Sequence, residues 1–537
     1  MWPHNYTPLA GSLGLSSLAA ALPIFVLLWL LGVKRKPAWI AGVAGLGAAA
    51  FVALAVYGMP AGMTLSAVAY GAAFGLFPIG WIVFWAIVLY RITVETGNFD
   101  VIKDSIGGLT ADRRLQAILI AFALSGFIEG AAGFGTPVAV AAAMMAGLGF
   151  SPFYAAAICL LGNTSPVAFG SIGIPVVTLA GITGLPQQAL SGAVGRILAP
   201  VSLIVPAYMV GVMAGWAGLA GVLPAAAVCG AAFAITQYYV SAYIGPQISA
   251  IASSMVAIVA LVVLLRLWKP ARNFELEADA SPPAAGAHHS FGRSLLAWSP
   301  YLLLVLFVVL WGLDSVKALL NSVTRPIPWP GLHNQIERIP PVVAKAAPYA
   351  AVFNLNWLSA AGTACLLATL GSCIVLRVSP ARYGRIIAAT ARQLFLPLVT
   401  IAAVLGLAFL MNYCGATATL GLAFAATGAL FPFFSSMLGW LGVFLTGSDT
   451  SSNALFGSLQ RITAERLGLD PVLMAASNAA GGVMGKMISL QSIAVAAAAT
   501  GLRGEDEAKL FRFTLRHSIV LASLIGLVTT VWAYVLR

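Results

Sequence analysis

The stretch that decides the fold covers residues 120–149 and reads IAFALSGFIEGAAGFGTPVAVAAAMMAGLG. It is apolar on both sides of a single carboxylate, Glu129. An ionisable side chain at membrane depth is costly, and it usually faces a polar cavity or another charge. Asp449 and Lys486 interrupt apolar stretches in the same way. We therefore interpret all three residues as functional candidates, with a structural ion pair as the alternative for each.

The composition predicts a membrane protein. Of the 537 residues, 60% are hydrophobic and 8% are charged, and the mean hydropathy is +0.96. A soluble fold could not hide that much apolar surface. The net charge of +12 comes from basic residues in short loops, which the positive-inside rule explains without a nucleic-acid partner. The five cysteines lack metal or disulfide spacing, so we predict that they are packing residues.

The predicted fold class is an all-α polytopic membrane protein with about twelve transmembrane helices, two re-entrant hairpins, and inverted repeats with broken helices. Basic loops favour an external amino terminus. Residues 412–434 are apolar enough for a further crossing, but counting them would put the basic segment 503–516 outside, so they stay uncounted. The predicted crossings are residues 12–33, 38–57, 64–91, 153–185, 196–216, 219–240, 247–268, 295–312, 357–377, 391–411, 472–500 and 517–537.

Two apolar stretches do not fit as crossings. Residues 115–128 would form a helix of about 14 residues and about 21 Å, which is shorter than a hydrocarbon core of roughly 30 Å. A Gly-rich tip and a short returning run follow, which predicts a re-entrant hairpin over residues 115–147. Residues 435–460 predict a second one. Non-helical backbone at this depth must face protein or a water-filled cavity. If these arms are full spans instead, the protein has about fourteen helices or more.

Each hairpin is followed by a long apolar segment with a break, and the two units are similar. Residues 162–175 contain two prolines, while residues 478–491 contain three glycines and Lys486. Proline leaves carbonyl groups unpaired and glycine permits unwinding, so both segments predict broken helices. In this alignment Glu129 lies opposite Asp449. The units enter from opposite sides, and such inverted repeats allow one site to open alternately to each side.

The predicted domains follow from these repeats. They are N-terminal helices in residues 1–63; a first inverted repeat in residues 64–218, with the hairpin at about 115–147 and the broken helix at 153–185; linking scaffold helices in residues 219–390, with a cytoplasmic loop 269–294 and an external loop 313–356; and a second inverted repeat in residues 391–537, with the hairpin at about 435–460 and the broken helix at 472–500. The external loop is predicted either to cap the protein or to be a plain linker.

Three motifs resemble the bacterial L-lactate permease family, which includes glycolate permeases. They are EGAAGFGTP at residues 129–137, GNTSPVAFG at residues 162–170 and TGSDTSSNALFG at residues 446–457. The resemblance extends over nearly the whole chain. It implies a multi-pass protein of the bacterial cytoplasmic (inner) membrane that takes up L-lactate and related small 2-hydroxymonocarboxylates, such as glycolate and D-lactate, together with a proton. It implies no enzyme activity.

Half-helix amino termini attract anions, so we expect the substrate carboxylate at the breaks and tips, with Lys486 or Arg196 adding positive charge. Burial disfavours a charged carboxylate, so Glu129 or Asp449 is expected to carry the coupling proton. The alternative is a direct pair between Glu129 and Lys486, which leaves Asp449 as the proton carrier. The predicted substrate-binding residues are Thr136, Asn163, Thr164, Ser165, Ser171, Thr450, Ser451, Ser452, Asn453, Lys486, Ser489 and Gln491, with the 2-hydroxyl at Ser171, Ser489 or Gln491.

Several alternatives stay open at this stage. A passive anion channel would also use polar tips, and unwound carbonyl groups could coordinate a coupling sodium ion instead of a proton. An intramembrane enzyme is disfavoured because none of the five histidines lies at the centre of a predicted span and no His-Glu-x-x-His pattern exists. We expect no metal and no cofactor besides the proton. The expected partners are a small organic monocarboxylate and membrane lipid, and a homodimer stays open.

Overall fold

The computed structural model is almost entirely helical and describes the chain except residues 108, 134, 275–288, 344, 503–504 and 537. In the described part, 12 helices are long and apolar enough to cross a membrane, or 13 if one bent pair is counted as a single span. This confirms the predicted all-α membrane class with about twelve spans. Much of the predicted cytoplasmic loop 269–294 lies outside the described residues.

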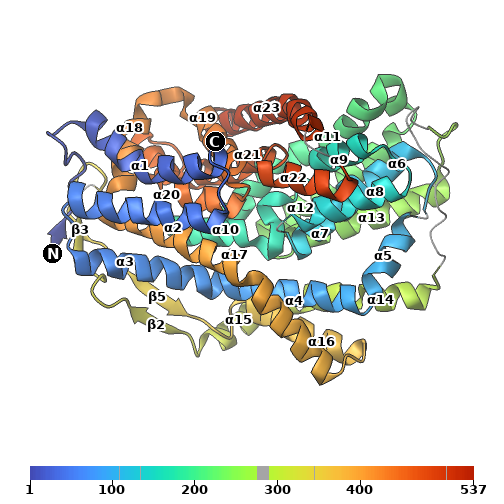
Figure 1. Ribbon diagram of the computed structural model, residues 1–537, viewed down its shortest axis with the longest axis horizontal. Coiled ribbons are helices and arrows are strands. Elements are labelled where there is room, and N and C mark those ends of the chain that lie inside the picture. The colour runs from blue at the N-terminus through green and yellow to red at the C-terminus, as the bar shows by residue number, and fades with distance from the viewer. Residues whose placement is uncertain (108, 134, 275–288, 344, 503–504, 537) are drawn as a thin grey trace.

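The N-terminal helices pack along the long helix α17 (Figure 1). Gly71 permits this close packing, because a Cβ there would lie 2.8 Å from Gly406 Cα on α17. The crossings predicted at 64–91 and 391–411 are longer in the structure, because their helices continue beyond the apolar residues. The elements are α1 (Leu13–Gly32), α2 (Ala38–Phe51), η1 (Val52–Val56), α3 (Ala61–Phe74), η2 (Gly75–Gly80), α4 (Trp81–Glu95) and α17 (Pro380–Cys414).

A second group of helices packs outside the hairpin units. Its longest member begins at Gln187, well before the predicted residue 196, and regular helical geometry is interrupted at Gly215. The elements are α5 (Asn98–Gly107), α11 (Gln187–Ala220), α12 (Leu223–Tyr243), α13 (Ser249–Leu267), α14 (Phe291–Gly312), α15 (Asp314–Asn321), α16 (Ala361–Val375) and α23 (Glu505–Tyr534). In Figure 1, α5, α11, α12, α13 and α14 lie toward the other end of the molecule, whereas α15 and α16 lie along its lower edge and α23 along its upper edge.

The predicted external loop 313–356 contains regular structure. Besides α15 it holds four short strands, β2 (Arg325–Pro328), β3 (Ile336–Arg338), β4 (Ala347–Pro348) and β5 (Val352–Leu355). β2 pairs antiparallel with β5, while β3 pairs antiparallel with β4 and parallel with the N-terminal strand β1 (Trp2–Pro3). The segment therefore forms a small sheet with the N-terminal residues of the chain. It is a folded segment, so the plain-linker alternative was wrong.

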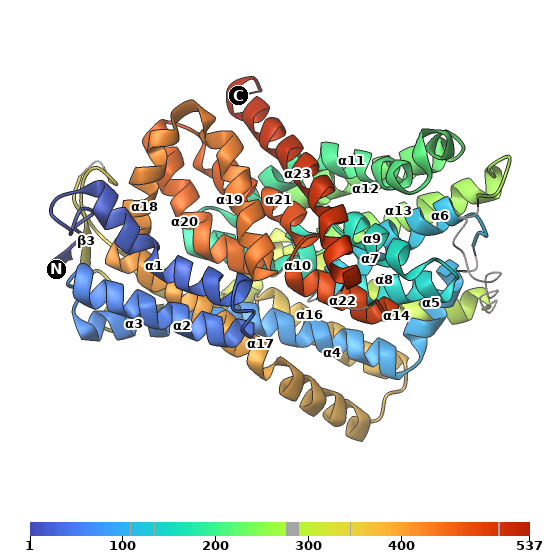
Figure 2. The same ribbon diagram turned by 45° about the horizontal axis from the view of Figure 1, so that its top comes forward.

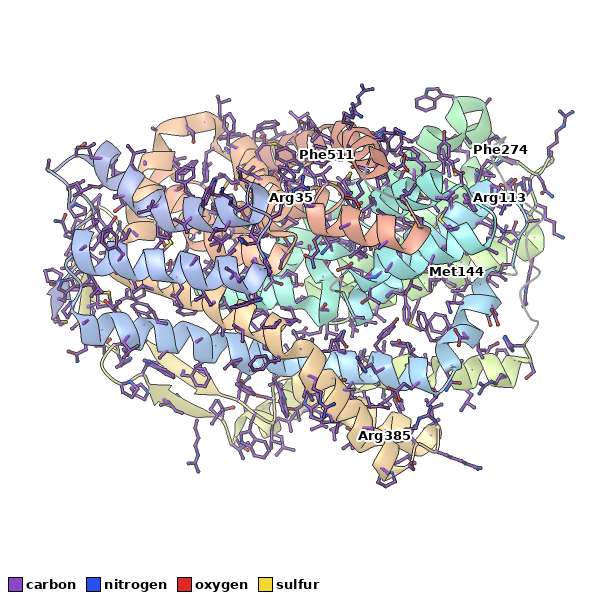
Figure 3. All side chains as sticks on the ribbon, viewed as in Figure 1. Arg35, Arg113, Met144, Phe274, Arg385 and Phe511 are labelled. Atoms are coloured by element: carbon purple, nitrogen blue, oxygen red, sulfur yellow. The ribbon has the colours of Figure 1, made fainter. Side chains whose placement is uncertain are left out.

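The first hairpin has a longer entering arm than we predicted from residues 115–128. Three consecutive elements, α6 (Arg113–Ala117), η3 (Ile118–Leu124) and α7 (Ser125–Ala131), form one buried helix of 19 residues that is long enough to span. The helix starts early because Asp112 caps it and pairs with Arg114 at 2.6 Å. Arg113 N donates to the carbonyl of Phe274 at 3.2 Å, and Figure 3 shows both residues at one end of the molecule.

The returning arm of the first hairpin is short, and a broken helix follows it. The arm is α8 (Thr136–Gly147), whose 12 residues cover only about 18 Å. The next helix, α9 (Pro152–Gly162), ends at Asn163, and the chain continues through η4 (Val167–Phe169) into α10 (Gly170–Thr183) with a bend of 66°. The broken helix predicted at 153–185 is confirmed.

The second unit repeats this order with other lengths. The uncounted residues 412–434 form no single straight helix: they include the end of α17, then α18 (Ala416–Phe424) and η5 (Ala425–Leu430), and the chain turns near Gly428 (Figure 2). The hairpin consists of α19 (Phe431–Thr446) and α20 (Asp449–Leu467), so its returning arm extends past the predicted residue 460. The broken helix predicted at 472–500 is α21 (Pro471–Lys486) and α22 (Leu490–Thr500).

One half-helix of each unit packs against the hairpin of the other unit. α10 of the first unit packs against α20, the returning arm of the second hairpin. In the same way α22 of the second unit packs against α8, the returning arm of the first hairpin. This reciprocal packing brings the break of each unit beside the hairpin of the other and places both breaks inside the molecule.

Candidate functional site

A cavity of about 290 Å³ lies between the second hairpin tip, the two breaks and helices α2 and α17. Both hairpin units contribute to its wall. The lining residues are Ala38, Trp39, Glu129, Val167, Gly170, Ser171, Ile174, Pro175, Leu396, Pro397, Thr400, Ile401, Thr446, Gly447, Ser448, Asp449, Thr450, Ser451, Lys486 and Gln491. All three charges singled out in the sequence are among them, so residues more than 300 positions apart form one site.

The wall from the first unit is a left-handed turn at the start of α10. Ser171, Ile172 and Gly173 have φ values of +44°, +60° and +74°. This conformation is unfavourable for a β-branched residue such as Ile172, and backbone strain of this kind persists only where the surroundings enforce it. Ser171 Oγ donates to the carbonyl of Ala132 at 3.0 Å, which ties the turn to the first hairpin tip. The turn therefore forms a fixed wall of the cavity.

Glu129 lies in the last turn of the entering arm α7 and is 4% exposed. Asn163 Nδ2 donates to its Oε2 at 2.9 Å. The other oxygen, Oε1, packs so closely on Gly170 that a Cβ there would lie 2.7 Å away. Among the described residues Glu129 has no ion-pair partner, so Asn163 and the glycine surface hold it in place.

The wall from the second unit is the hairpin tip itself. Gly447, with φ +71°, ends α19, and Ser448 caps α20 by accepting a hydrogen bond from Ser451 N at 3.2 Å. The first N–H groups of a helix have no partner within the helix, and its amino terminus carries a partial positive charge. The first turn of α20 therefore presents an anion-attracting end to the cavity.

Asp449 is the first residue of α20 and is 3% exposed. Its Oδ1 has no hydrogen-bond partner among the described residues, and its Oδ2 has Asn453 Nδ2 at 3.5 Å. Oδ1 lies against Gly482 on α21, where a Cβ would overlap it. Asp449 is therefore a buried carboxylate whose ionised form receives much less hydrogen bonding than Glu129 does.

Lys486 is the last residue of α21, and its Nζ donates to the carbonyl of Gly447 at 2.9 Å. The ammonium group thus lies at the carboxyl end of α19, where a positive charge is favourable. Within the described part of the chain no carboxylate lies within 4.0 Å of Nζ, so the direct pair with Glu129 does not form. An ammonium group has three donors, and Lys486 faces the cavity with capacity for a further acceptor.

The structure brings only some of the predicted substrate-binding residues to the cavity. Those that line it are Ser171, Thr450, Ser451, Lys486 and Gln491. Two asparagines lie directly behind the wall. Asn163 supports Glu129, and Asn453 Nδ2 donates to the carbonyl of Pro175 at 3.1 Å while its Oδ1 accepts from Asn478 at 2.9 Å. These asparagines position the wall rather than face the cavity.

The other predicted residues have local partners or lie elsewhere. Thr164 and Ser452 donate to the carbonyls of Leu161 and Gly439, and Ser489 caps α22. The remaining two do not line the cavity either: the Ser165 carbonyl accepts from Gln237, and Thr136 is the first residue of α8. Arg196, the alternative cation, is exposed and lies over the Trp532 ring at 4.9 Å.

The sequence did not indicate the fourth side of the cavity. Trp39 on α2 and Pro397 and Thr400 on α17 line it. No charge or polar cluster marks these positions, and only the proline inside an apolar helix could have drawn attention to α17. The alignment of Glu129 with Asp449 was also wrong. Glu129 precedes its tip, whereas Asp449 follows its tip, so Thr136, the first residue of the returning arm α8, is the counterpart of Asp449.

A polar cavity between hairpin tips and broken helices, surrounded by about twelve spans, is typical of membrane transporters. The chain belongs to the L-lactate permease family, since the model of that family, described as L-lactate permease, matches residues 16–536. With the 12 candidate spans and bacterial relatives, this makes it a multi-pass protein of the bacterial cytoplasmic membrane.

Similar proteins cover the whole chain. The L-lactate permease of Bacillus subtilis (strain 168) is 46% identical, over 98% of this chain and 98% of that protein. The L-lactate permease of Escherichia coli (strain K12) is 44% identical, over 100% and 99%. The glycolate permease GlcA of the same strain is 43% identical, over 99% and 98%. These relatives indicate a transporter rather than an enzyme.

Proposed function

We propose that the protein is a secondary active transporter that takes up L-lactate and related 2-hydroxymonocarboxylates, including glycolate and D-lactate, in symport with a proton. The names of the relatives support the substrate class. The observation that carries the proposal is the set of charges around one cavity, two carboxylates and one ammonium group. Lactate and glycolate differ by one methyl group, which changes selectivity by about 1–3 kcal/mol, so both acids belong to the proposed substrate class.

The substrate carboxylate binds between Lys486 and the first turn of α20 in this proposal. Both present positive charge to the cavity, from the ammonium group and from the amino end of the helix. Thr450 and Ser451 add donors there, and Gln491 and Ser171 are the candidates to hold the 2-hydroxyl. The apolar wall from Ile174 and Ile401 then faces the substrate carbon atoms.

The charge balance favours cotransport with a cation. If Glu129, Asp449 and Lys486 are all ionised, the cavity carries −1 −1 +1 = −1, and a bound lactate would raise this to −2. Uncompensated buried charge is strongly unfavourable. One proton on a carboxylate restores −1 with the substrate bound, the value of the empty site. We assign that proton to Asp449, because its Oδ1 has no donor among the described residues whereas Glu129 accepts from Asn163.

Uptake by alternating access completes the proposal. The predicted repeats, residues 64–218 and 391–537, would be the parts that rearrange around the cavity, because each supplies one break and one hairpin. A sodium ion could balance the charge as well as a proton could. A passive channel is the second alternative, and it would let the anion equilibrate without accumulation.

The test uses the purified full-length protein in liposomes with an internal pH-sensitive dye. L-lactate added outside should acidify the lumen in sodium-free buffer, and an imposed inward proton gradient should drive accumulation that an uncoupler abolishes. Asp449→Asn should lose lactate-driven proton entry and keep lactate exchange. Asp470→Asn is the matched control, because Asp470 is an exposed helix cap outside the cavity.

Each outcome separates two mechanisms. If Asp449→Asn keeps full proton coupling and Glu129→Gln loses it, the coupling proton is assigned to Glu129. Full coupling in both variants overturns the assignment to the cavity carboxylates. Accumulation that requires sodium selects the sodium alternative, and uptake that never exceeds equilibrium selects the channel.

A further inference from the structure

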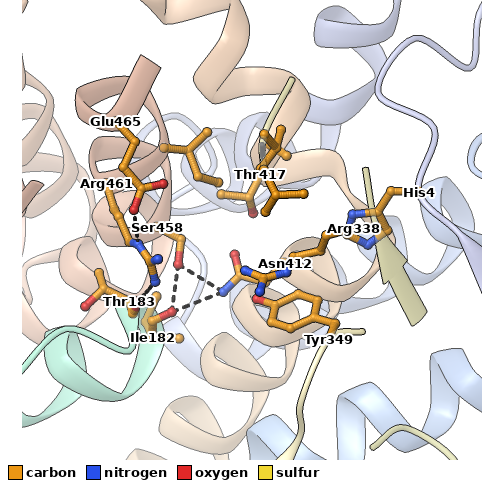
Figure 4. A pocket seen from close by; sticks show the side chains of 14 residues that line it. His4, Ile182, Thr183, Arg338, Tyr349, Asn412, Thr417, Ser458, Arg461 and Glu465 are labelled. Atoms are coloured by element: carbon orange, nitrogen blue, oxygen red, sulfur yellow. Dashed lines mark hydrogen bonds and ion pairs between the residues drawn. The ribbon is translucent and has the colours of Figure 1, made fainter. Parts of the chain in front are cut away.

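A second, smaller cavity of about 80 Å³ lies at the far end of the α10–α20 pair (Figure 4). α20 begins at the central cavity with Asp449 and reaches the second one with Arg461. At about 1.5 Å per residue, these positions are roughly 18 Å apart along the helix. The folded-back segment 313–356 closes this cavity through Arg338 and Tyr349. It is therefore separate from the central site.

Most polar groups of the second cavity already have partners. Arg461 pairs with Glu465 at 2.7 Å and donates to the carbonyl of Thr183 at the end of α10. Asn412 and Ser458 donate to the carbonyl of Ile182 beside it. These donors satisfy the last carbonyl groups of α10, and the opposite charges of Arg461 and Glu465 neutralise each other.

His4 adds no charge at neutral pH. Its Nε2 donates to the carbonyl of Tyr413 at 2.9 Å. Burial lowers the pKa of His4 from 6.5 to about 4, so the imidazole is neutral at pH 7. The remaining ionisable group of the cavity wall that bears charge is Arg338.

Arg338 has no counter-ion in the part of the chain that the structure describes. Its guanidinium carbon lies 4.7 Å from the centre of the Tyr349 ring, and its Nε is buried without a hydrogen-bond partner among the described residues. No described carboxylate lies within 4.0 Å of it. A guanidinium group has five donors in a rigid plane that matches a carboxylate, so a buried Nε without an acceptor is unusual. The cavity thus carries one unbalanced positive charge.

We propose that this cavity binds one small monocarboxylate anion on Arg338, as a second site distinct from the central cavity. The guanidinium group would hold the carboxylate through two parallel hydrogen bonds. A volume of roughly 10–15 Å³ is enough for one water molecule, so the space suits an acid of about six heavy atoms, the size of lactate. Arg461 lies on the other side of the cavity and adds a second guanidinium group to its wall.

The second site would collect the anion near the end of the helix pair that leads to the central cavity. A cleft of one charge raises the local concentration of an oppositely charged substrate. The choice of L-lactate as the probe rests on the proposed function. The alternative is that Arg338 only stacks on Tyr349 and stabilises the strands.

The experiment is equilibrium dialysis of isotope-labelled L-lactate with the purified full-length protein. The wild type should bind two equivalents and Arg338→Gln one. Arg325→Gln should keep two, because Arg325 is exposed on β2 of the same segment and lies outside the cavity wall. Val343→Phe, which fills the cavity from the folded-back segment, should also bind one and serves if Arg338→Gln does not fold. Two equivalents in both Arg338→Gln and Val343→Phe would overturn the proposal.

A central-site variant separates this proposal from the proposed function. Lys486→Gln should lose the other equivalent and keep the one on Arg338. If the wild type binds one equivalent that only Lys486→Gln removes, the second site is refuted and the central site stands. If only Arg338→Gln removes it, the central site is refuted instead. Displacement of the second equivalent by equal chloride would show a general anion site and overturn the carboxylate assignment.

Discussion

The two hairpin units have the same order of elements but use it differently. In the first unit the tip is tied to the left-handed turn by Ser171, and the carboxylate of Glu129 accepts from Asn163. In the second unit the tip lines the cavity. Within the described chain, Asp449 Oδ1 has no hydrogen-bond partner and Lys486 Nζ donates only to a carbonyl. Repeated topology has therefore produced one unit whose carboxylate accepts a good hydrogen bond and one whose carboxylate and ammonium group keep capacity for a ligand. An asymmetric site of this kind suits an asymmetric substrate.

Lys486→Gln tests this difference most strongly. Loss of a hydrogen bond from a charged donor costs about 1.5–3 kcal/mol, which corresponds to a rise of roughly 10- to 150-fold in the KM for L-lactate. Initial uptake rates in proteoliposomes measure it. Lys509→Gln on the exposed face of α23 is the control and should leave KM unchanged. A KM within twofold of the wild type for Lys486→Gln would show that the cation is only a cap for α19.

Gly482→Ala and Gly170→Ala compare the packing of the two carboxylates. The Cβ of an alanine at position 482 would overlap Asp449 Oδ1. The Cβ of an alanine at position 170 would lie 2.7 Å from Glu129 Oε1. Forcing extra volume into a packed site costs about 1–3 kcal/mol. We expect both variants to transport more slowly, with the larger loss at Gly482.

Gly62→Ala on α3 is the control for both variants, because a Cβ there meets no atom within 4 Å. Thermal unfolding of each variant separates a shifted carboxylate from a damaged fold. Equal transport by Gly482→Ala and the wild type would mean that the position of Asp449 is not critical.

Ser448→Ala and Ser151→Ala give the smallest and most selective comparison. Ser448 caps α20 at the cavity, and Ser151 caps α9 away from it. Each loss of a cap should reduce the free energy of unfolding by about 1 kcal/mol. Only Ser448→Ala should also raise the KM for L-lactate, because only that helix end faces the proposed substrate. A matching rise in Ser151→Ala would indicate a general loss of structure.

Particular residues show where prediction from the sequence ended. The short-arm interpretation of residues 115–128 failed because Asp112 pairs with Arg114 and lets a buried helix begin among charged residues. Residues 412–434 stay uncounted as a crossing because of the charge of a distant loop, and the same topology places residues 313–356 outside. Neither hydropathy nor loop charge can reveal the turn near Gly428 or the pairing of β1 with β3. Of the predicted binding residues, Thr164 donates to the carbonyl of Leu161 beside the break, and Ser452 donates to the carbonyl of Gly439 on the other arm of its hairpin.

The sequence by itself determined the membrane class, the family, the two hairpins, the two breaks and the three charges, because apolar length, glycine and proline placement and isolated ionisable residues act locally. Only the tertiary structure decided which of these features meet. It packed α10 and α22 against the hairpins of the opposite units and brought α2 and α17 to the cavity. It also left Asp449 Oδ1 without a hydrogen-bond partner among the described residues, while Glu129 accepts a hydrogen bond from Asn163. The physical reason is that a buried polar group acquires its role from the partners that packing leaves it, and those partners are distant in the chain.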